Sequence, residues 1–258
     1  MIKLNTIEVS DAISYLNKIE NETIDLMVCD PPYGIAIDDW DVFQSEEEYF
    51  NFIYSWLEIS LLKLKPTGSI YLFNNSYNSA MILSFLKDKN VHFQNWLTWY
   101  KKDGFTALTK KYNRVQETIL FLTKDKKKYT FNYNEIRVPY ESSERIKSAE
   151  KKGILKNGKR WFPNKDGKLC GDVWEFSSEK NRNRVNGKTV KQFHATPKPL
   201  EMIKRIIKAS SNKGDVVLDL FMGSGTTALA CKELNRNFLG CDINSEYVEY
   251  SMERLKQF

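Results

Sequence analysis

Residues 216–230, with the sequence VVLDLFMGSGTTALA, place an apolar run, a glycine turn and a row of small residues directly after one another. The apolar run predicts a buried strand, and the small residues predict a helix that begins as soon as the turn ends. Gly223 and Gly225 let the backbone come close to a ligand, and free amides at such a helix start favour polar or anionic groups. A steric need for a tight turn also explains the glycines, so the segment indicates an α/β unit before it indicates a ligand.

Other segments repeat this alternation of strand and helix along the chain. Apolar runs predict further strands at residues 24–30, 69–74, 95–100, 117–124 and 237–243. Apolar residues at helical spacing predict helices at residues 44–64, 78–89, 197–210, about 224–235 and from about 245. Pro66 and Gly68 are expected to break the chain between a helix and a strand. This order predicts an α/β fold with a doubly wound, mostly parallel sheet.

Residues 125–192 interrupt the alternation with charged residues, Asn, Gly and isolated aromatic side chains. Between Lys124 and Lys191 there are 19 basic against 9 acidic residues, whereas the rest of the chain holds 20 against 24, so the surplus of positive charge lies here. Such a surplus favours a polyanionic partner, DNA or RNA, although a solvated lysine-rich surface is the plainer explanation of any single run. The predicted organisation is one α/β domain in two halves, 1–124 and 193–258, with a loop-rich basic module inserted at 125–192.

Acidic side chains end three of the predicted strands, at Asp30, Asp219 and Asp242. Ligands of open α/β sheets bind outside the carboxyl ends of the strands, so these acids can share one crevice although they are far apart in sequence. Asp242 follows the glycine turn by about 20 residues, where an acid can bind ribose hydroxyls, which favours an adenosine-containing cofactor. The turn lacks the third glycine of the dinucleotide fingerprint and the GK[ST] of a P-loop.

The segment VCDPPYGI at residues 28–35 ends a predicted core strand with an acid, two prolines and an aromatic residue. Pro31 and Pro32 donate no hydrogen bonds and stiffen the turn, which leaves its carbonyls free to accept. The Asp30 carboxylate and a carbonyl of the Pro-Pro segment could bind both hydrogens of a planar NH2 group, while Tyr33 stacks on the ring that bears it. Both N–H bonds would then be held by acceptors, and the nitrogen lone pair would turn toward an electrophile such as a methyl sulfonium.

Several other classes of protein are disfavoured by the composition. The four cysteines form no CxxC pair and there are only two histidines, so no metal site is expected. No stretch approaches the length of about 20 apolar residues that a membrane span needs, and residues 1–13 lack the apolar core of a signal peptide. A cytoplasmic protein without a membrane partner is therefore expected. Cys29, which precedes the acid, is expected to be part of the strand core.

The motifs taken together resemble a known family. DPPY at 30–33, FMGSGTT at 221–227 and GCDIN at 240–244 resemble the amino-methyltransferases that use S-adenosylmethionine to methylate DNA bases. DPPY precedes the cofactor turn and the basic module lies between them, as in the permuted beta group of these enzymes. The similarity extends to HATPKP at 194–199 and RVQETILFLTK at 114–124. RVPYES at 137–142 and ILKNGKRWFP at 154–163 are similar to the MboII-type adenine-N6 modification methyltransferases.

This resemblance implies a Rossmann-like methyltransferase fold, S-adenosylmethionine as cofactor and double-stranded DNA as substrate. It assigns the flipped target base to Asp30, Pro31, Pro32 and Tyr33. It assigns the cofactor to Asp219, Phe221, Gly223, Ser224, Gly225, Thr226 and Asp242, and its methionine end to Thr196, Lys198 and Pro199. Candidate DNA contacts are Arg160, Arg182, Asn183, Arg184 and Lys188. A target inside a duplex would have to be flipped out, with Tyr33 and Trp40 as candidates to replace its stacking.

The resemblance also implies a role in restriction-modification, with an asymmetric purine-rich site of the GAAGA kind, and it suggests a homodimer and a cognate restriction endonuclease as partners. Three alternatives stay open at this point. Cytosine-N4 methylation uses the same chemistry, although that group more often carries serine in place of the acid at position 30. RNA or protein amides are other possible methyl acceptors. A non-catalytic DNA-binding subunit would keep the fold without the reaction.

Overall fold

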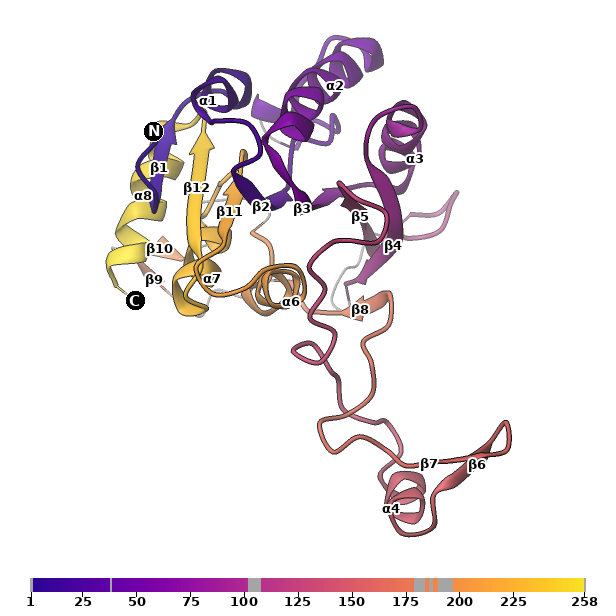
Figure 1. Ribbon diagram of the computed structural model, residues 1–258. Helices are drawn as coiled ribbons and strands as arrows, with labels where there is room; N and C mark the ends of the chain where they lie inside the picture. The colour runs from indigo at the N-terminus through magenta and orange to yellow at the C-terminus, as the bar shows by residue number, and fades with distance from the viewer. Residues whose placement is uncertain are drawn as a thin grey trace.

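The computed structural model describes residues 2–37, 39–101, 108–178, 184–185, 188–189 and 197–257 (Figure 1), with the backbone alone at residues 39, 143, 184, 185, 188 and 189. An eight-stranded sheet in the order β1-β12-β11-β2-β3-β5-β4-β8 forms its centre. Its strands are β1 (Thr6–Val9), β2 (Ile24–Cys29), β3 (Leu64–Asn74), β4 (His92–Tyr100), β5 (Gln116–Thr123), β8 (Val173–Glu175), β11 (Val216–Asp219) and β12 (Asn237–Asp242).

The sheet is mostly parallel. Strand β5 runs antiparallel to its neighbours β3 and β4, and the other five pairs of neighbouring strands are parallel. The strand order reverses between β2 and β11, the point at which ligands bind in doubly wound sheets. The predicted fold class is thereby confirmed, and residues 30 and 219 lie on either side of this reversal.

Helices cover both faces of the sheet (Figure 1). One face packs against α1 (Ala12–Lys18), α2 (Glu46–Lys63) and α3 (Ser76–Leu86), and the other against α6 (Leu200–Ser210), α7 (Thr226–Glu233) and α8 (Ser245–Lys256). Side chains of Ser45, Asn75 and Asn244 accept hydrogen bonds from the first amides of α2, α3 and α8, so each of these helices has a polar cap.

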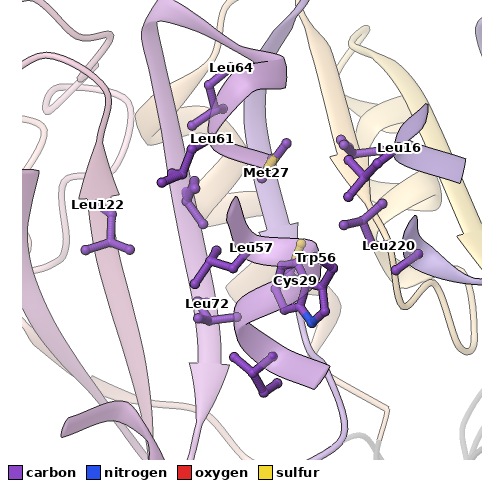
Figure 2. Close-up of a cluster of buried hydrophobic side chains, with 14 of the residues drawn as sticks. Leu16, Met27, Cys29, Trp56, Leu57, Leu61, Leu64, Leu72, Leu122 and Leu220 are labelled. Atoms are coloured by element: carbon purple, nitrogen blue, oxygen red, sulfur yellow. The ribbon is translucent and has the colours of Figure 1, made fainter. Parts of the chain in front are cut away.

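Figure 2 shows part of the core between the sheet and the first group of helices. Trp56 and Leu57 of α2 lie against Met27 and Cys29 of β2, and all four side chains are fully buried. The expectation that Cys29 belongs to the strand core is confirmed. No helix within the described part of the chain is long and apolar enough to cross a membrane.

Two features of the first half differ from the sequence-based expectation. Strand β1 and helix α1, which were not predicted, add an edge strand beside β12. Pro66 and Gly68 do not separate α2 from β3, because β3 already begins at residue 64 and contains both. The pairing of β3 with β2 shifts register between Leu64 and Ser69, and this irregularity accommodates Pro66 and Gly68, which regular strands disfavour.

Residues 125–178 leave the central domain and return to it. Tyr129 and Phe131 still pack against Phe121 of β5. Beyond them, α4 (Ser143–Lys152), β6 (Ile154–Lys156) and β7 (Lys159–Trp161) project away from the sheet as an arm, which we define as residues 139–167 (Figure 1). Val138 and Lys168 exchange two backbone hydrogen bonds of 3.0 and 2.9 Å at its base. The chain then rejoins the sheet as β8, and β9 (Arg184–Val185) and β10 (Lys188–Thr189) form a separate two-stranded pair.

Candidate active site

A cavity of about 770 Å³ opens at the carboxyl ends of the parallel strands. Asp30, at the end of β2, and Asp242, at the end of β12, both line it. A smaller recess beside it is lined by Asp30, Asp219 and the glycine turn. The structure thus brings the three acids to one edge of the sheet, as the strand order predicts.

Asp30 is held from two sides. Its Oδ1 accepts a hydrogen bond of 2.9 Å from the Tyr33 hydroxyl, and its Oδ2 accepts one from the Lys198 ammonium. Lys198 comes from the segment before α6 and is only 8% exposed, so its charge is buried beside the carboxylate. Each carboxylate oxygen keeps a further lone pair, which leaves Asp30 able to accept from a bound amine.

Glu117 of β5 is a third charged group in this cluster, and it was not predicted from the sequence. Its carboxylate lies 3.1 Å from the Tyr33 hydroxyl, whose single proton it shares with Asp30. It also lies 3.7 Å from the Lys198 nitrogen and binds the ammonium of Lys101, which follows β4. The cluster therefore alternates in sign, with Lys101, Glu117, Lys198 and Asp30 in succession. One acid within an otherwise apolar strand, ETILFLT, was the sequence signal that could have indicated it.

These contacts move the pKa values of the cluster in opposite directions. Burial raises the pKa of Asp30, the positive charge of Lys198 lowers it, and the negative charge of Glu117 raises it further, so that it lies above the ordinary value. Burial also acts to raise the pKa of Glu117, but Lys198 and Lys101 outweigh it and the pKa is lowered. Of the two acids, Asp30 accepts a proton more readily.

Asp41 organises the loop that follows the two prolines. It lies at the end of the short 3-10 helix η1 (Asp39–Asp41) and is 1% exposed. Its carboxylate accepts hydrogen bonds of 2.6 to 3.2 Å from the backbone amides of Tyr33, Gly34, Ile35 and Ile37, and its carbonyl accepts from that of Ala36. All five amides of residues 33–37 thus point to one residue, which the sequence did not single out.

The glycine turn is built on buried acids. Asp219 accepts from the Thr227 hydroxyl at 2.6 Å and from the amide of Phe221 at 3.0 Å, and burial raises its pKa to about 7. Asp242 accepts from the amide of Gly223 at 2.8 Å while it faces the cavity. The structure brings these residues together as predicted. Asp219 binds the residues on both sides of the turn, Phe221 and Thr227, and so supports the conformation of the turn.

Helix α8 supports the same turn from behind. Ser251 donates to the carbonyl of Gly223 at 2.8 Å, and the buried guanidinium of Arg254 donates to the carbonyl of Ser224 at 2.9 Å. Arg254 also donates to the hydroxyl of Thr226, which lies 3.1 Å from that of Ser224. Gly225 has a φ of +74°, and a Cβ there would lie 2.8 Å from the Cβ of Ser251. A side chain at this position would therefore push the turn away from α8.

The remaining predicted residues lie in different places. Phe221 lines the cavity and packs against Trp56, and Pro199 is the N-cap residue of α6. Thr196, Arg182 and Asn183 lie outside the described residues. Arg160 is exposed on β7 in the arm. Arg184 and Lys188 lie on β9 and β10, on the opposite side of the molecule from the arm (Figure 1). The candidate DNA contacts that the structure describes, Arg160, Arg184 and Lys188, thus do not form one compact patch.

The chain matches a sequence profile that describes DNA methylases acting on N6 or N4 amines, over residues 24–253. It belongs to this DNA methylase family. A type II methyltransferase of Moraxella bovis, M1.MboII, is 52% identical over 257 residues, covering 100% of this chain and 98% of the relative. The DNA adenine methyltransferase YhdJ of Escherichia coli strain K12 is 33% identical over 260 residues, covering 97% and 82%.

Among solved structures, the complex of M1.HpyAVI with SAM superimposes with a TM-score of 0.65 at 24% identity, covering 97% of this methylase and 98% of that chain. This likeness supports the Rossmann-like fold. The resemblance to DNA amino-methyltransferases predicted from DPPY and the glycine turn is confirmed by the family match. The family includes N6 and N4 enzymes, so the family match alone does not decide which amine is methylated.

Proposed function

We propose that this methylase transfers a methyl group from S-adenosylmethionine to the N6 amine of adenine in duplex DNA, as part of restriction-modification. The observation that carries the proposal is the position of Asp30, Pro31 and Tyr33 in the same cavity as Asp242. A base-sized ring against Tyr33 and a nucleoside-sized ligand against Asp242 would then meet within one space. Its volume of about 770 Å³ lies in the usual range for small-molecule sites.

The residues of the cavity fit S-adenosylmethionine. Asp242 offers a carboxylate for ribose hydroxyls, Ile243 and Tyr247 offer apolar surface beside it, and the absence of a Cβ at Gly225 lets the turn sit close to α8. When bound, the cofactor supplies a methyl group on a positively charged sulfur. Asp30 provides a carboxylate on the side of the cavity where the amine would lie, and its ion pair with Lys198 holds that carboxylate in place.

The residues of DPPY would align the amine. Asp30 and the carbonyl of Pro31 would each accept one N–H bond, and no described residue donates to that carbonyl in the structure. The nitrogen lone pair would point out of the ring plane, and the enzyme would supply alignment and electrostatics for an in-line transfer. The nitrogen gains a methyl group and loses one proton, for which Asp30, with its raised pKa, is the nearest acceptor.

Within the predicted module at residues 125–192, the arm and the β9–β10 segment would recognise the target, between halves of the catalytic domain at 1–124 and 193–258. Exposed lysines and arginines of the arm, Arg160 among them, would contact phosphates, and the β9–β10 segment would approach the duplex elsewhere. Thr196, Lys198 and Pro199 would serve the methionine end of the cofactor, with Lys198 also pairing with Asp30. A homodimer, a cognate endonuclease and a cytoplasmic location follow from the resemblance and belong to the same proposal.

The test is incubation of the purified protein with isotopically labelled S-adenosylmethionine and unmethylated bacterial DNA, followed by nucleoside mass spectrometry. We expect label in N6-methyldeoxyadenosine, and sequencing of the product would then locate the site. Label in N4-methyldeoxycytidine would keep the mechanism and change the base. Absence of label from DNA would overturn the proposal, and RNA, protein and calorimetric cofactor-binding assays would then separate another substrate from a non-catalytic subunit.

A further inference from the structure

The loop after DPPY carries aliphatic side chains that do not contribute to the core. Ile35 and Ile37 are 42% and 47% exposed, although both line the rim of the 770 Å³ cavity. Ile35 also lines a neighbouring cavity of about 720 Å³, so it stands on the ridge between the two. Large apolar side chains left in water beside a binding cavity indicate a surface that another molecule covers.

The same loop is held firmly in place. Every backbone amide from residue 33 to residue 37 donates to Asp41, whose buried carboxylate takes four of the five. Ala36, at the tip, has a φ of +52°, a left-handed conformation that a residue with a Cβ adopts only at a cost. Since the backbone amides of the loop all donate to the buried Asp41, the exposed isoleucine side chains stand on a preorganised support.

The surroundings of the tip favour nucleic acid as the covering molecule. Arg114 and Gln116 line both cavities beside Ile35, Arg114 is exposed, and no described residue forms an ion pair with it. A guanidinium next to an apolar tip suits the phosphate and the base faces of one DNA strand. Tyr33, which would receive the target base, lies two residues before Ile35 on the same loop.

We propose that residues 35–37 act as a wedge, with Ile35 and Ile37 entering the base stack of the duplex and filling the space that the flipped nucleotide leaves. The inference rests on the proposed function, because it presupposes a duplex substrate whose target base is flipped out. It adds a specific partner surface, the stacked bases next to the target. Inserted aliphatic side chains are used in this way by proteins that unstack DNA.

The loop could alternatively cover the cofactor as a lid, and the wedge makes a prediction that this alternative does not. Extruding a paired base costs unstacking and unpairing, and this cost is smaller when the base has no partner. Replacing both isoleucines by serine should therefore slow methylation of a fully paired site about tenfold or more. The same variant should methylate a duplex with an abasic site opposite the target adenine at a rate within about threefold of the wild type.

The experiment compares the wild type, the double variant Ile35→Ser/Ile37→Ser and the control Leu62→Ser, at an aliphatic residue that is 55% exposed at the far end of α2. Each is assayed on the site mapped by sequencing, in paired and abasic-opposite form, together with cofactor affinity by calorimetry. A duplex with 2-aminopurine at the target position reports flipping, and its fluorescence should rise less with the double variant.

Three results would overturn the wedge. If the double variant loses the same factor in methylation rate on both duplexes, the isoleucines contact DNA or substrate without assisting base flipping. A loss of cofactor affinity in the double variant would indicate that the loop covers the cofactor instead. Unchanged rates of the double variant on the paired site would show that the loop does not contribute to methylation. If the wild type methylates no DNA, the proposed function itself fails, whereas a wild type that works beside unimpaired variants refutes the wedge alone.

Discussion

Asp30 has a partner on each carboxylate oxygen before any substrate arrives, Tyr33 on one and Lys198 on the other. An ion pair in a buried site costs desolvation, which only good geometry repays. The cost is understandable if the cluster keeps Asp30 ionised and correctly oriented in a place where burial alone would protonate it. Stability is then given up locally for a defined charge at the reaction site.

Replacing Asp30 by asparagine tests this role. Asp30→Asn keeps the size of the side chain and removes the negative charge, so methyl transfer should fall by at least about a hundredfold. Cofactor affinity should stay within about threefold, because the glycine turn and Asp242, to which the cofactor is assigned, lie on elements other than β2. Single-turnover rates and calorimetry measure the two effects. Asp25→Asn, at the other end of β2, is the matched control, and a variant at residue 30 that keeps full turnover would contradict the assignment.

The pH dependence of the rate tests the charge cluster. Since the proposed role needs an ionised Asp30, the rate should decline as the pH falls through its raised pKa, at a pH above the usual range of aspartate. Glu117→Gln removes a negative neighbour and should shift this decline to lower pH. Lys198→Met removes the positive neighbour and should shift it to higher pH.

Single-turnover rates between about pH 5 and pH 9 provide the measurement, with circular dichroism at each pH to exclude unfolding. The opposite directions of the two shifts are the decisive feature, since general destabilisation would move both variants the same way. Two shifts in one direction would show that neither neighbour controls the charge of Asp30.

At the scale of elements, α7 and α8 together fix the glycine turn. Gly225→Ala adds a Cβ in a left-handed conformation and against Ser251, so cofactor affinity should fall about tenfold or more, equivalent to about 1.4 kcal/mol. The double variant Gly225→Ala/Ser251→Gly removes the contacts of 2.8 and 2.9 Å with the Ser251 side chain, although it also loses the Ser251 hydrogen bond to Gly223, and it should bind the cofactor more tightly than Gly225→Ala alone. Calorimetry measures all three proteins.

Gly214→Ala is the control for backbone strain. Gly214 has a φ of +87°, but a Cβ added there would meet no atom within 4 Å, so the substitution strains the backbone without a clash. Its cofactor affinity should equal that of the wild type. An unchanged affinity for Gly225→Ala would mean that the turn does not shape the cofactor site.

The elements also show what could be predicted from sequence. Apolar periodicity identified the strands that end in Asp30, Asp219 and Asp242, and the rule for ligands at strand ends brought them to one edge. Strand β1 and helix α1 were not predicted, because their four and seven residues are too few to show a clear apolar periodicity. No local pattern could have revealed that the amides of a whole loop converge on Asp41, because that contact depends on the path of the loop in space.

Lys198 is a residue that the sequence did single out, but whose contact with Asp30 could not be predicted from a local pattern. The HATPKP motif drew attention to it, but only the folded chain shows its ammonium against Asp30, 168 positions away. Pro66 and Gly68 are a case in which local signals were misleading. Proline and glycine usually end a strand, but here a register shift in the pairing with β2 allows β3 to include both residues.

At the scale of the whole molecule, the basic arm stands apart from the cavity. Lys147, Lys151 and Lys152 are exposed on α4, and replacing them by glutamine should weaken DNA binding without changing cofactor affinity. Each lost phosphate contact should reduce the slope of log affinity against log salt by about 0.9. Fluorescence anisotropy across a salt series measures this.

The matched control replaces Lys3, Lys87 and Lys213, which are exposed on other parts of the molecule, by glutamine. It lowers the net charge without touching the arm, so any small loss of affinity should come without the change in slope. Equal slopes for the wild type and the arm variant would place the phosphate contacts elsewhere, for example on the β9–β10 segment.

The two backbone hydrogen bonds between Val138 and Lys168 have a consequence for how such enzymes diversify. Paired residues of this kind lie about 5.5 Å apart, so the arm leaves and re-enters the domain at almost one point. A segment with adjacent ends can be exchanged for another of different length without stretching the scaffold. Evolution, or a protein engineer, could therefore graft a new arm onto this junction while the sheet, the glycine turn and the Asp30 cluster remain as they are.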